Sequence, residues 1–273
     1  MTRPLLFLAV GSALVITPAI SPAALAQDMI NNLPDYTGAW VMGDLMQRRG
    51  RDNGGADGRS KAPPRPESRE ARLERQATYT PSAKVRSNVE SAFAAYLGGK
   101  QPESAPMLLR ALAADSPPGS PFVRLLAATL GNSEDAIRRQ LEIGTLQGDY
   151  SDWLASMGYS DRNLFDVNTA FLMHSWSIAN GGVTTRYPKI TFRVVRDDLI
   201  AQQDPARLGE RGNTRKQEEA QSFALFTAAL VSAWADGDAR ERAILSDGVA
   251  ALGKRIGIDY ERVTLSAEGF ETR

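Results

Sequence analysis

The chain has 273 residues, of which 42% are hydrophobic and 23% charged, as expected of a globular protein that folds around an apolar core. It contains no cysteine, which excludes disulfides, thiolate metal sites, iron–sulfur clusters and cysteine nucleophiles. The only histidine is His174, so no site can use two imidazoles. The 32 basic and 32 acidic residues cancel, and we expect no nucleic-acid partner because the chain has no global field for a polyanion.

The first 26 residues have the organisation of a bacterial export signal. Arg3 gives a positive start, residues 5–16 form an apolar run, and residues 24–26 read Ala-Leu-Ala, a small-x-small cleavage site. The run is too short to cross a bilayer, which takes about 20 apolar residues. We therefore expect residues 1–26 to be a signal peptide that is cleaved between Ala26 and Gln27. The mature protein, with no transmembrane segment, would be soluble in the periplasm or secreted.

Residues 27–46 form a short apolar tail, in which Tyr36 and Trp40 stand among aliphatic and polar residues. Pro34, Gly38 and Gly43 interrupt any regular period. Two interpretations are open: a strap that lies on its own domain, or a peptide motif whose Trp40 docks into a partner. The strap is favoured, because apolar residues near a terminus pack on their own domain when they can.

Residues 47–78 have the composition of a disordered linker. They are rich in Arg, Gly, Pro, Asp and Glu, and Leu73 is the only large aliphatic residue between positions 47 and 77. Such a segment buries too little apolar surface to offset the entropy of ordering it, so we expect at most a nascent helix over residues 67–76. The basic run at 48–51 could suggest an anionic surface as partner, but a solvated linker is the simpler interpretation.

Residues 79–273 are predicted to form one compact all-α domain of about seven helices. Thr80-Pro81 and Ser120-Pro121 are N-cap signals followed by proline, and Ser133 is an N-cap before a further helix. Capping boxes are predicted at Thr214 with Gln217 and at Asp238 with Glu241.

One internal helix should lie at the centre of this domain. Residues 162–180 carry two apolar stripes, which indicates burial on most faces. Residues 189–202 fit either a helix or a strand, and helix is favoured because a lone strand would have nothing to pair with. A brief β-like run, residues 263–265, precedes Gly269-Phe270.

Several short motifs of this domain occur in a recognisable order. They are Tyr79-Thr80-Pro81-Ser82 with Val85-Arg86 and Asn88, then Asn163 and Asp166 before an aromatic helix ending near Trp176, then Lys216-Gln217, then Thr264 with Gly269-Phe270. The order resembles a helical domain of exported proteobacterial proteins that is known only as a domain of unknown function. The resemblance covers residues 79–270 and implies an exported helical domain without implying a reaction. The family has a shorter segment at 101–130, and it has tyrosine and tryptophan where this chain has Asn168 and Phe171.

Motifs for catalysis are missing from the sequence. There is no Gly-x-Ser-x-Gly elbow and no Ser-x-x-Lys motif, and Gly99-Lys100 is followed by Gln101 rather than the Ser or Thr of a phosphate loop. The adjacent acids Asp197/Asp198 and Glu218/Glu219 would point about 100° apart on a helix, so neither pair makes a site by itself. We therefore expect no cofactor and no metal.

The candidate binding residues are Trp40, Tyr79, Arg86, His174 and Trp176. Four of them also have a structural interpretation: core packing for Trp176 and His174, surface solvation for Arg86, and a strap for Trp40. The function we expect is that of an exported domain that acts by binding, with a periplasmic or extracellular protein as the expected kind of partner. The alternative is a cofactor-free periplasmic hydrolase that uses scattered carboxylates. A hydrolase should show acids facing each other in a concave pocket, and an interaction module should show an exposed apolar patch.

Overall fold

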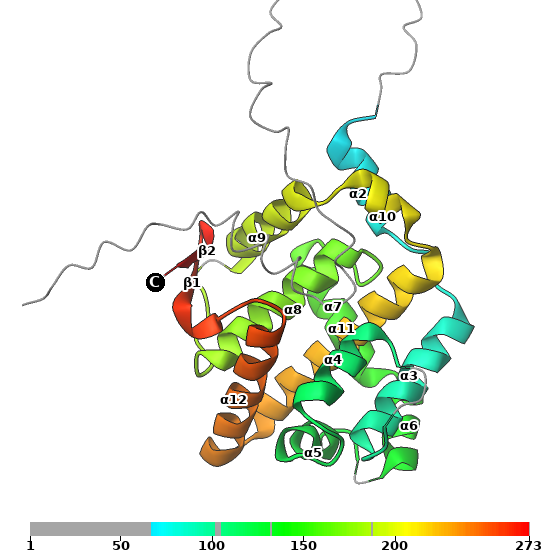
Figure 1. The fold of residues 1–273 in the computed structure, drawn as a ribbon, viewed down its shortest axis with the longest axis vertical. Helices are drawn as coiled ribbons and strands as arrows, with labels where there is room; N and C mark the ends of the chain where they lie inside the picture. Colours follow the sequence, from blue (N-terminus) through cyan, green and yellow to red (C-terminus); the bar gives the residue numbers. More distant parts are fainter. Residues whose placement is uncertain (1–66, 102–104, 132, 187, 273) are drawn as a thin grey trace, which may run out of the picture.

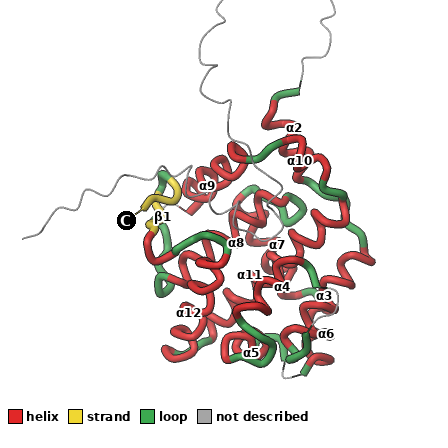
Figure 2. The backbone as a smooth tube through the Cα atoms, viewed as in Figure 1, coloured by secondary structure: helices red, strands yellow, loops and turns green. Residues whose placement is uncertain are grey.

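The computed structural model describes residues 67–272, apart from 102–104, 132 and 187. Within these residues the chain forms eleven α-helices, one 3-10 helix and one small hairpin (Figures 1 and 2). The helices are α2 (Arg69–Ala77), α3 (Ala83–Leu97), α4 (Met107–Asp115), α5 (Pro121–Ala128), α6 (Glu134–Ile143), α7 (Thr145–Met157), α8 (Leu164–Ala179), α9 (Pro188–Gln202), α10 (Pro205–Glu210), α11 (Asn213–Asp236) and α12 (Ala239–Arg255). The all-α prediction is confirmed, but the expected number of about seven helices was too low. Within the described part, every helix is too short or too polar to cross a membrane.

Helices α8 and α11 pack against each other at the centre of the domain. The ring of Phe171 on α8 lies 4.7 Å from that of Phe223 and 6.0 Å from that of Phe226, both on α11. Helix α8 is buried on most of its faces, as its two apolar stripes predicted. Helix α12 packs closely on α5 at Gly248, where an added Cβ atom would overlap the ring of Phe122. The core is therefore one continuous cluster that joins all the long helices.

The ambiguous segment is a helix, α9, so the choice made for residues 189–202 is confirmed. The β-like run near the C-terminus forms β1 (Val263–Ser266), which pairs antiparallel with β2 (Gly269–Thr272), and Leu265 lies opposite Phe270. This hairpin packs on α9 through β2. It is the only sheet in the described part of the chain.

The folded domain begins earlier than predicted, so the linker assigned to residues 47–78 was wrong over its last part. Helix α2 is docked on the domain, with Leu73 and Ala77 fully buried. A nine-residue helix is marginal in isolation, so tertiary contacts must hold it in place. Residues 47–66 lie outside the described residues, as do the predicted signal peptide and apolar tail.

The segment that joins α2 to α3 is clamped by side chains of α11. The amide of Asn213 donates to the carbonyl of Thr80 and accepts from its N–H, both at 2.7 Å. Gln217 makes the same pair of bonds to Ser82, at 2.9 and 2.8 Å. The predicted Thr214–Gln217 capping box is therefore wrong: the N-cap of α11 is Gly212, and the Gln217 side chain is used at Ser82. The Asp238–Glu241 box and the Ser133 cap are confirmed.

Candidate functional site

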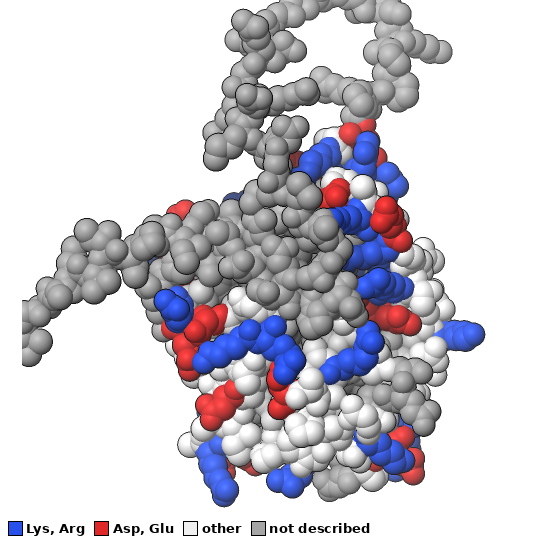
Figure 3. Space-filling model, viewed as in Figure 1, with Lys and Arg blue, Asp and Glu red and all other residues white. Residues whose placement is uncertain are grey.

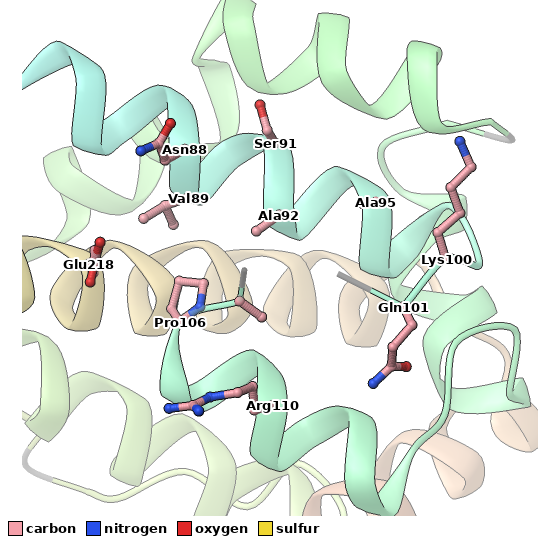
Figure 4. A pocket seen from close by; sticks show the side chains of 11 residues that line it. Asn88, Val89, Ser91, Ala92, Ala95, Lys100, Gln101, Pro106, Arg110 and Glu218 are labelled. Carbon is pink, nitrogen blue, oxygen red and sulfur yellow. The ribbon is translucent and has the colours of Figure 1, made fainter. Parts of the chain in front are cut away.

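A groove runs between α3 and α4 on the surface of the domain (Figure 4). Two neighbouring cavities, of about 870 and 600 Å³, share Ala105, Pro106, Arg110 and Glu218 and so form one continuous feature, which we call the α3–α4 groove. The first is also lined by Asn88, Val89, Ser91, Ala92, Ala95, Lys100 and Gln101. The second is also lined by Met107, Leu108, Gly212, Thr214, Arg215 and Glu219.

The groove owes its depth to small side chains on α3. Ala92 and Ala95 lie one helical turn apart, so both face the space between α3 and α4. Pro106, the N-cap of α4, forms the opposite side, and α11 passes behind both helices (Figure 4). Because these residues carry little side-chain volume, the backbone of a bound segment could approach the helices closely.

Polar groups line the groove around this small apolar surface. Asn88 and Gln101 each carry one hydrogen-bond acceptor and an NH₂ donor group, whereas Arg110 only donates and Glu218 only accepts when ionised. Figure 4 shows Glu218 at one end of the cavity, Lys100 and Gln101 at the other, and Arg110 across from α3. The lining of the groove can therefore form hydrogen bonds with both the donors and the acceptors of a ligand.

The charges near each end of the groove are partly paired. Lys100 lies 2.6 Å from Glu134 of α6; their hydrogen bond is the main cause that lowers the pKa of Glu134 and raises that of Lys100. Near the other end, Arg211 pairs with the buried carboxylate of Glu219 at 3.3 Å. Glu218 and Glu219 both line the groove, but the Glu219 carboxylate is held by Arg211, so these two acids do not form a free facing pair.

A second cluster of charged side chains lies away from the groove, where α2, α8 and α9 meet. Arg196 of α9 donates to both carboxylate oxygens of Glu74 at 2.6 and 2.7 Å, and to Asp166 at 2.5 Å. Asp166 also accepts from the backbone N–H of Ser160 at 2.8 Å, and Asn163 donates to Glu74 at 2.9 Å. This cluster contains two acids, but a guanidinium bridges them.

Burial raises the pKa of Asp166, and the hydrogen bond from Arg196 offsets only part of that effect. Burial also acts to raise the pKa of Glu74, but there the hydrogen bond and charge of Arg196 outweigh it, so the pKa is lowered. Both carboxylates are thus held by one arginine, an arrangement that ties α2 to the domain.

Two of the candidate binding residues, Tyr79 and Arg86, lie near the start of α3 but outside the groove. Tyr79 is buried, and its hydroxyl donates to the carbonyl of Asp161 at 3.1 Å, so it fixes the chain before α8. Arg86 pairs with Glu90 one turn along α3 at 2.7 Å, on the surface. Trp40, Ala26 and Gln27 lie outside the described residues.

The other two candidates share α8 but point to different neighbours. Trp176 is buried and donates its indole N–H to the carbonyl of Val263 at 3.0 Å. His174 is half-buried, and its ring lies 4.7 Å from that of Trp153 on α7. Tyr79, Arg86, His174 and Trp176 are therefore not brought together, and none of them lines the described cavities.

The burial of His174 predicts a pH dependence of stability. Burial lowers the pKa of its imidazole from 6.5 to about 4, so the folded state keeps the ring neutral. The unfolded chain takes up a proton as the pH falls below about 6.5, so this residue makes the native state less stable between pH 6.5 and 4. Replacing it in a His174→Gln variant should remove that contribution. Urea unfolding at pH 7, 5.5 and 4.5 should show wild type losing stability relative to the variant; a constant difference would contradict this.

The groove was missed from the sequence because its residues carry no distinctive motif. Of its polar residues, Asn88 belongs to the family-like pattern, Lys100 and Gln101 to a failed phosphate-loop match, and Glu218 and Glu219 to an adjacent pair of acids. None of these patterns predicts a groove. The packing of α4 beside α3 depends on tertiary contacts, which a local sequence pattern does not reveal. An interaction module was expected to show an exposed apolar patch. In the described part of the chain the exposed large hydrophobic residues lie on four separate segments: Ile143, Val183, Ile190 and Val231.

Comparison of the chain with models of protein families, with curated proteins and with solved structures finds no match. No activity, ligand or partner is therefore carried over from another protein. A proposal for function has to be built on the groove and on its chemistry.

Proposed function

We propose that the protein is an exported binding module whose α3–α4 groove takes an extended peptide segment of a periplasmic or extracellular partner. The observation that carries this proposal is the continuous groove, with small apolar residues on α3 and both hydrogen-bond donors and acceptors around them. Export itself is proposed from the signal-like residues 1–26.

An extended peptide fits the chemistry of the groove better than a purely apolar or a strongly charged ligand. Each peptide unit presents one N–H donor and one C=O acceptor, which must be paired when they leave water. The side chains of Asn88 and Gln101 can pair with both N–H and C=O groups. Arg110 can pair only with C=O groups, and Glu218 only with N–H groups. Among the described side chains visible in Figure 3, basic and acidic ones are interspersed, so these side chains do not create a single-signed field that would select a polyanion.

The test is a selection of displayed random peptides against the exported chain and against an Ala95→Trp variant. The indole would fill the space left by the small side chain on α3, so affinity for selected peptides should fall by about tenfold or more. The matched control is Ala243→Trp, which places the same side chain at an exposed position of α12. Thermal unfolding of both variants checks that they fold. Peptides that bind the Ala95→Trp variant as well as wild type would disprove the groove as their site.

A further inference from the structure

We infer that Glu218 determines the specificity of the α3–α4 groove by selecting peptide segments with a lysine or arginine side chain opposite its carboxylate. This inference rests on the proposed function, because it names the chemistry of the ligand for the same groove. A basic side chain of the segment, in addition to its backbone, then decides which peptide binds.

The two acids of the groove lining are used differently. The carboxylate of Glu219 is buried and pairs with Arg211 at 3.3 Å. The backbone carbonyl of Glu218 accepts from Ser222, but its carboxylate has no ion pair or hydrogen bond within the described part of the chain. Neighbouring residues on a helix point about 100° apart, so Arg211 pairs with Glu219 while Glu218 faces the groove.

The cations of the lining leave the charge of Glu218 without a partner. Lys100 pairs with Glu134 at the opposite end of the first cavity (Figure 4). Arg110 already has an interaction partner. Arg215 lies one turn before Glu218 on α11, but its side chain is exposed to solvent, which screens its charge. The carboxylate of Glu218 is therefore the charged group of the lining that a cation of the ligand can pair with.

Glu218 lies where the two cavities of the groove meet. It lines both of them, and α11, which carries it, passes behind α3 and α4 (Figure 4). Its side chain is half-buried, so the carboxylate is at the base of the groove rather than on its rim. Because the groove continues on both sides of Glu218, a bound segment passes over it. The cation is therefore a side chain of that segment and not its terminal amino group.

A ligand that covers Glu218 removes water that solvates its charge. An ionised carboxylate that loses this water without gaining a cation or hydrogen-bond donors opposes binding. A lysine or arginine side chain supplies the opposite charge together with several N–H donors. Asn88 lies toward the same end of the first cavity in Figure 4, and its amide oxygen is a second acceptor for such a group. An acidic side chain at this position of the peptide would instead face a like charge.

The test compares peptides selected from a displayed random library on the exported chain and on a Glu218→Gln variant. Peptides selected on wild type should share one position with lysine or arginine, and those selected on Glu218→Gln should not. Replacing that residue of a wild-type peptide with glutamine should weaken its binding to wild type by about tenfold, but its binding to Glu218→Gln by no more than about twofold. Titration calorimetry measures both affinities.

Two further variants give this test its controls. Asp236→Asn removes an exposed carboxylate at the far end of α11 and should behave as wild type. Glu218→Lys should reverse the preference and bind the peptide more tightly when glutamate replaces its basic residue. Thermal unfolding checks that all three variants fold.

The outcomes separate this inference from the proposed function. Selected peptides without a shared basic position, or equal losses on wild type and Glu218→Gln, would overturn the inference. A loss that follows acetylation of the peptide's amino end, rather than removal of a basic side chain, would overturn it in favour of a chain terminus. If such peptides still fail to bind Ala95→Trp, the proposed function stands without this inference. Peptides that bind Ala95→Trp as well as wild type would remove both.

Discussion

An Arg196→Ala variant should lose about 3–5 kcal/mol of stability, because it leaves a buried carboxylate without its cation. The Asp166 side chain is only 5% exposed, and Arg196 is the only arginine or lysine side chain bonded to it in the described part of the chain. The same change removes both hydrogen bonds to Glu74, so α2 loses its ionic attachment to α9. Chemical denaturation at neutral pH measures the loss.

Two further variants give this prediction its controls. Arg193→Ala removes an arginine from an exposed position of the same helix, and it should change stability by no more than about 0.5 kcal/mol. The double variant Arg196→Leu/Asp166→Leu removes both charges together, and it should recover a large part of the loss, because no buried charge is left unpaired. A loss below about 1 kcal/mol in Arg196→Ala would show that the cluster does not hold α2.

A Phe226→Ala variant should be similarly damaging, with a loss of about 3–5 kcal/mol. The ring is fully buried on α11 and lies within 6.3 Å of Phe122 and 6.0 Å of Phe171, so its removal leaves a cavity where α5, α8 and α11 meet. For a domain of this size such a loss lowers the melting temperature by roughly 10 °C. Calorimetry or circular dichroism during heating measures it.

The control on the same helix is Val231→Ala, at a side chain that is 37% exposed. It should shift stability by no more than about 0.5 kcal/mol. A Phe226→Leu variant keeps most of the volume and should fall between the two. Equal effects of the buried and the exposed substitutions would contradict the placement of α11 at the centre of the core.

The fold could be predicted wherever the signal was local. The capping box at Asp238 and the double stripe of residues 162–180 gave α12 and α8 correctly, because caps and apolar periodicity act within a few residues. The start of α3 could not be predicted in the same way. Thr80-Pro81 has the pattern of a helix start, but Asn213 holds the backbone of Thr80, and the N-cap falls at Ser82. That displacement comes from residues more than a hundred positions away in the sequence.

Helix α2 shows that the start of the folded domain cannot be predicted from local composition either. Its composition is that of a linker, with Leu73 and Ala77 as its only buried residues. The stabilising partner is Arg196, 122 positions further along the chain, which no composition argument could supply. The groove could not be predicted either, because the alanines of α3 form one side of it only once α4 and α11 are in place.

The central claim, that the α3–α4 groove is a peptide-binding site, is tested most directly by NMR mapping of a selected peptide on the isotope-labelled chain. The backbone amide signals of Asn88, Ala92, Arg110 and Glu218 should shift most on titration, and those of the C-terminal hairpin should stay in place. The Ala95→Trp variant should show no such shifts at the same peptide concentration. Shifts that cluster on α9 or the hairpin while the groove amides stay unchanged would contradict the account.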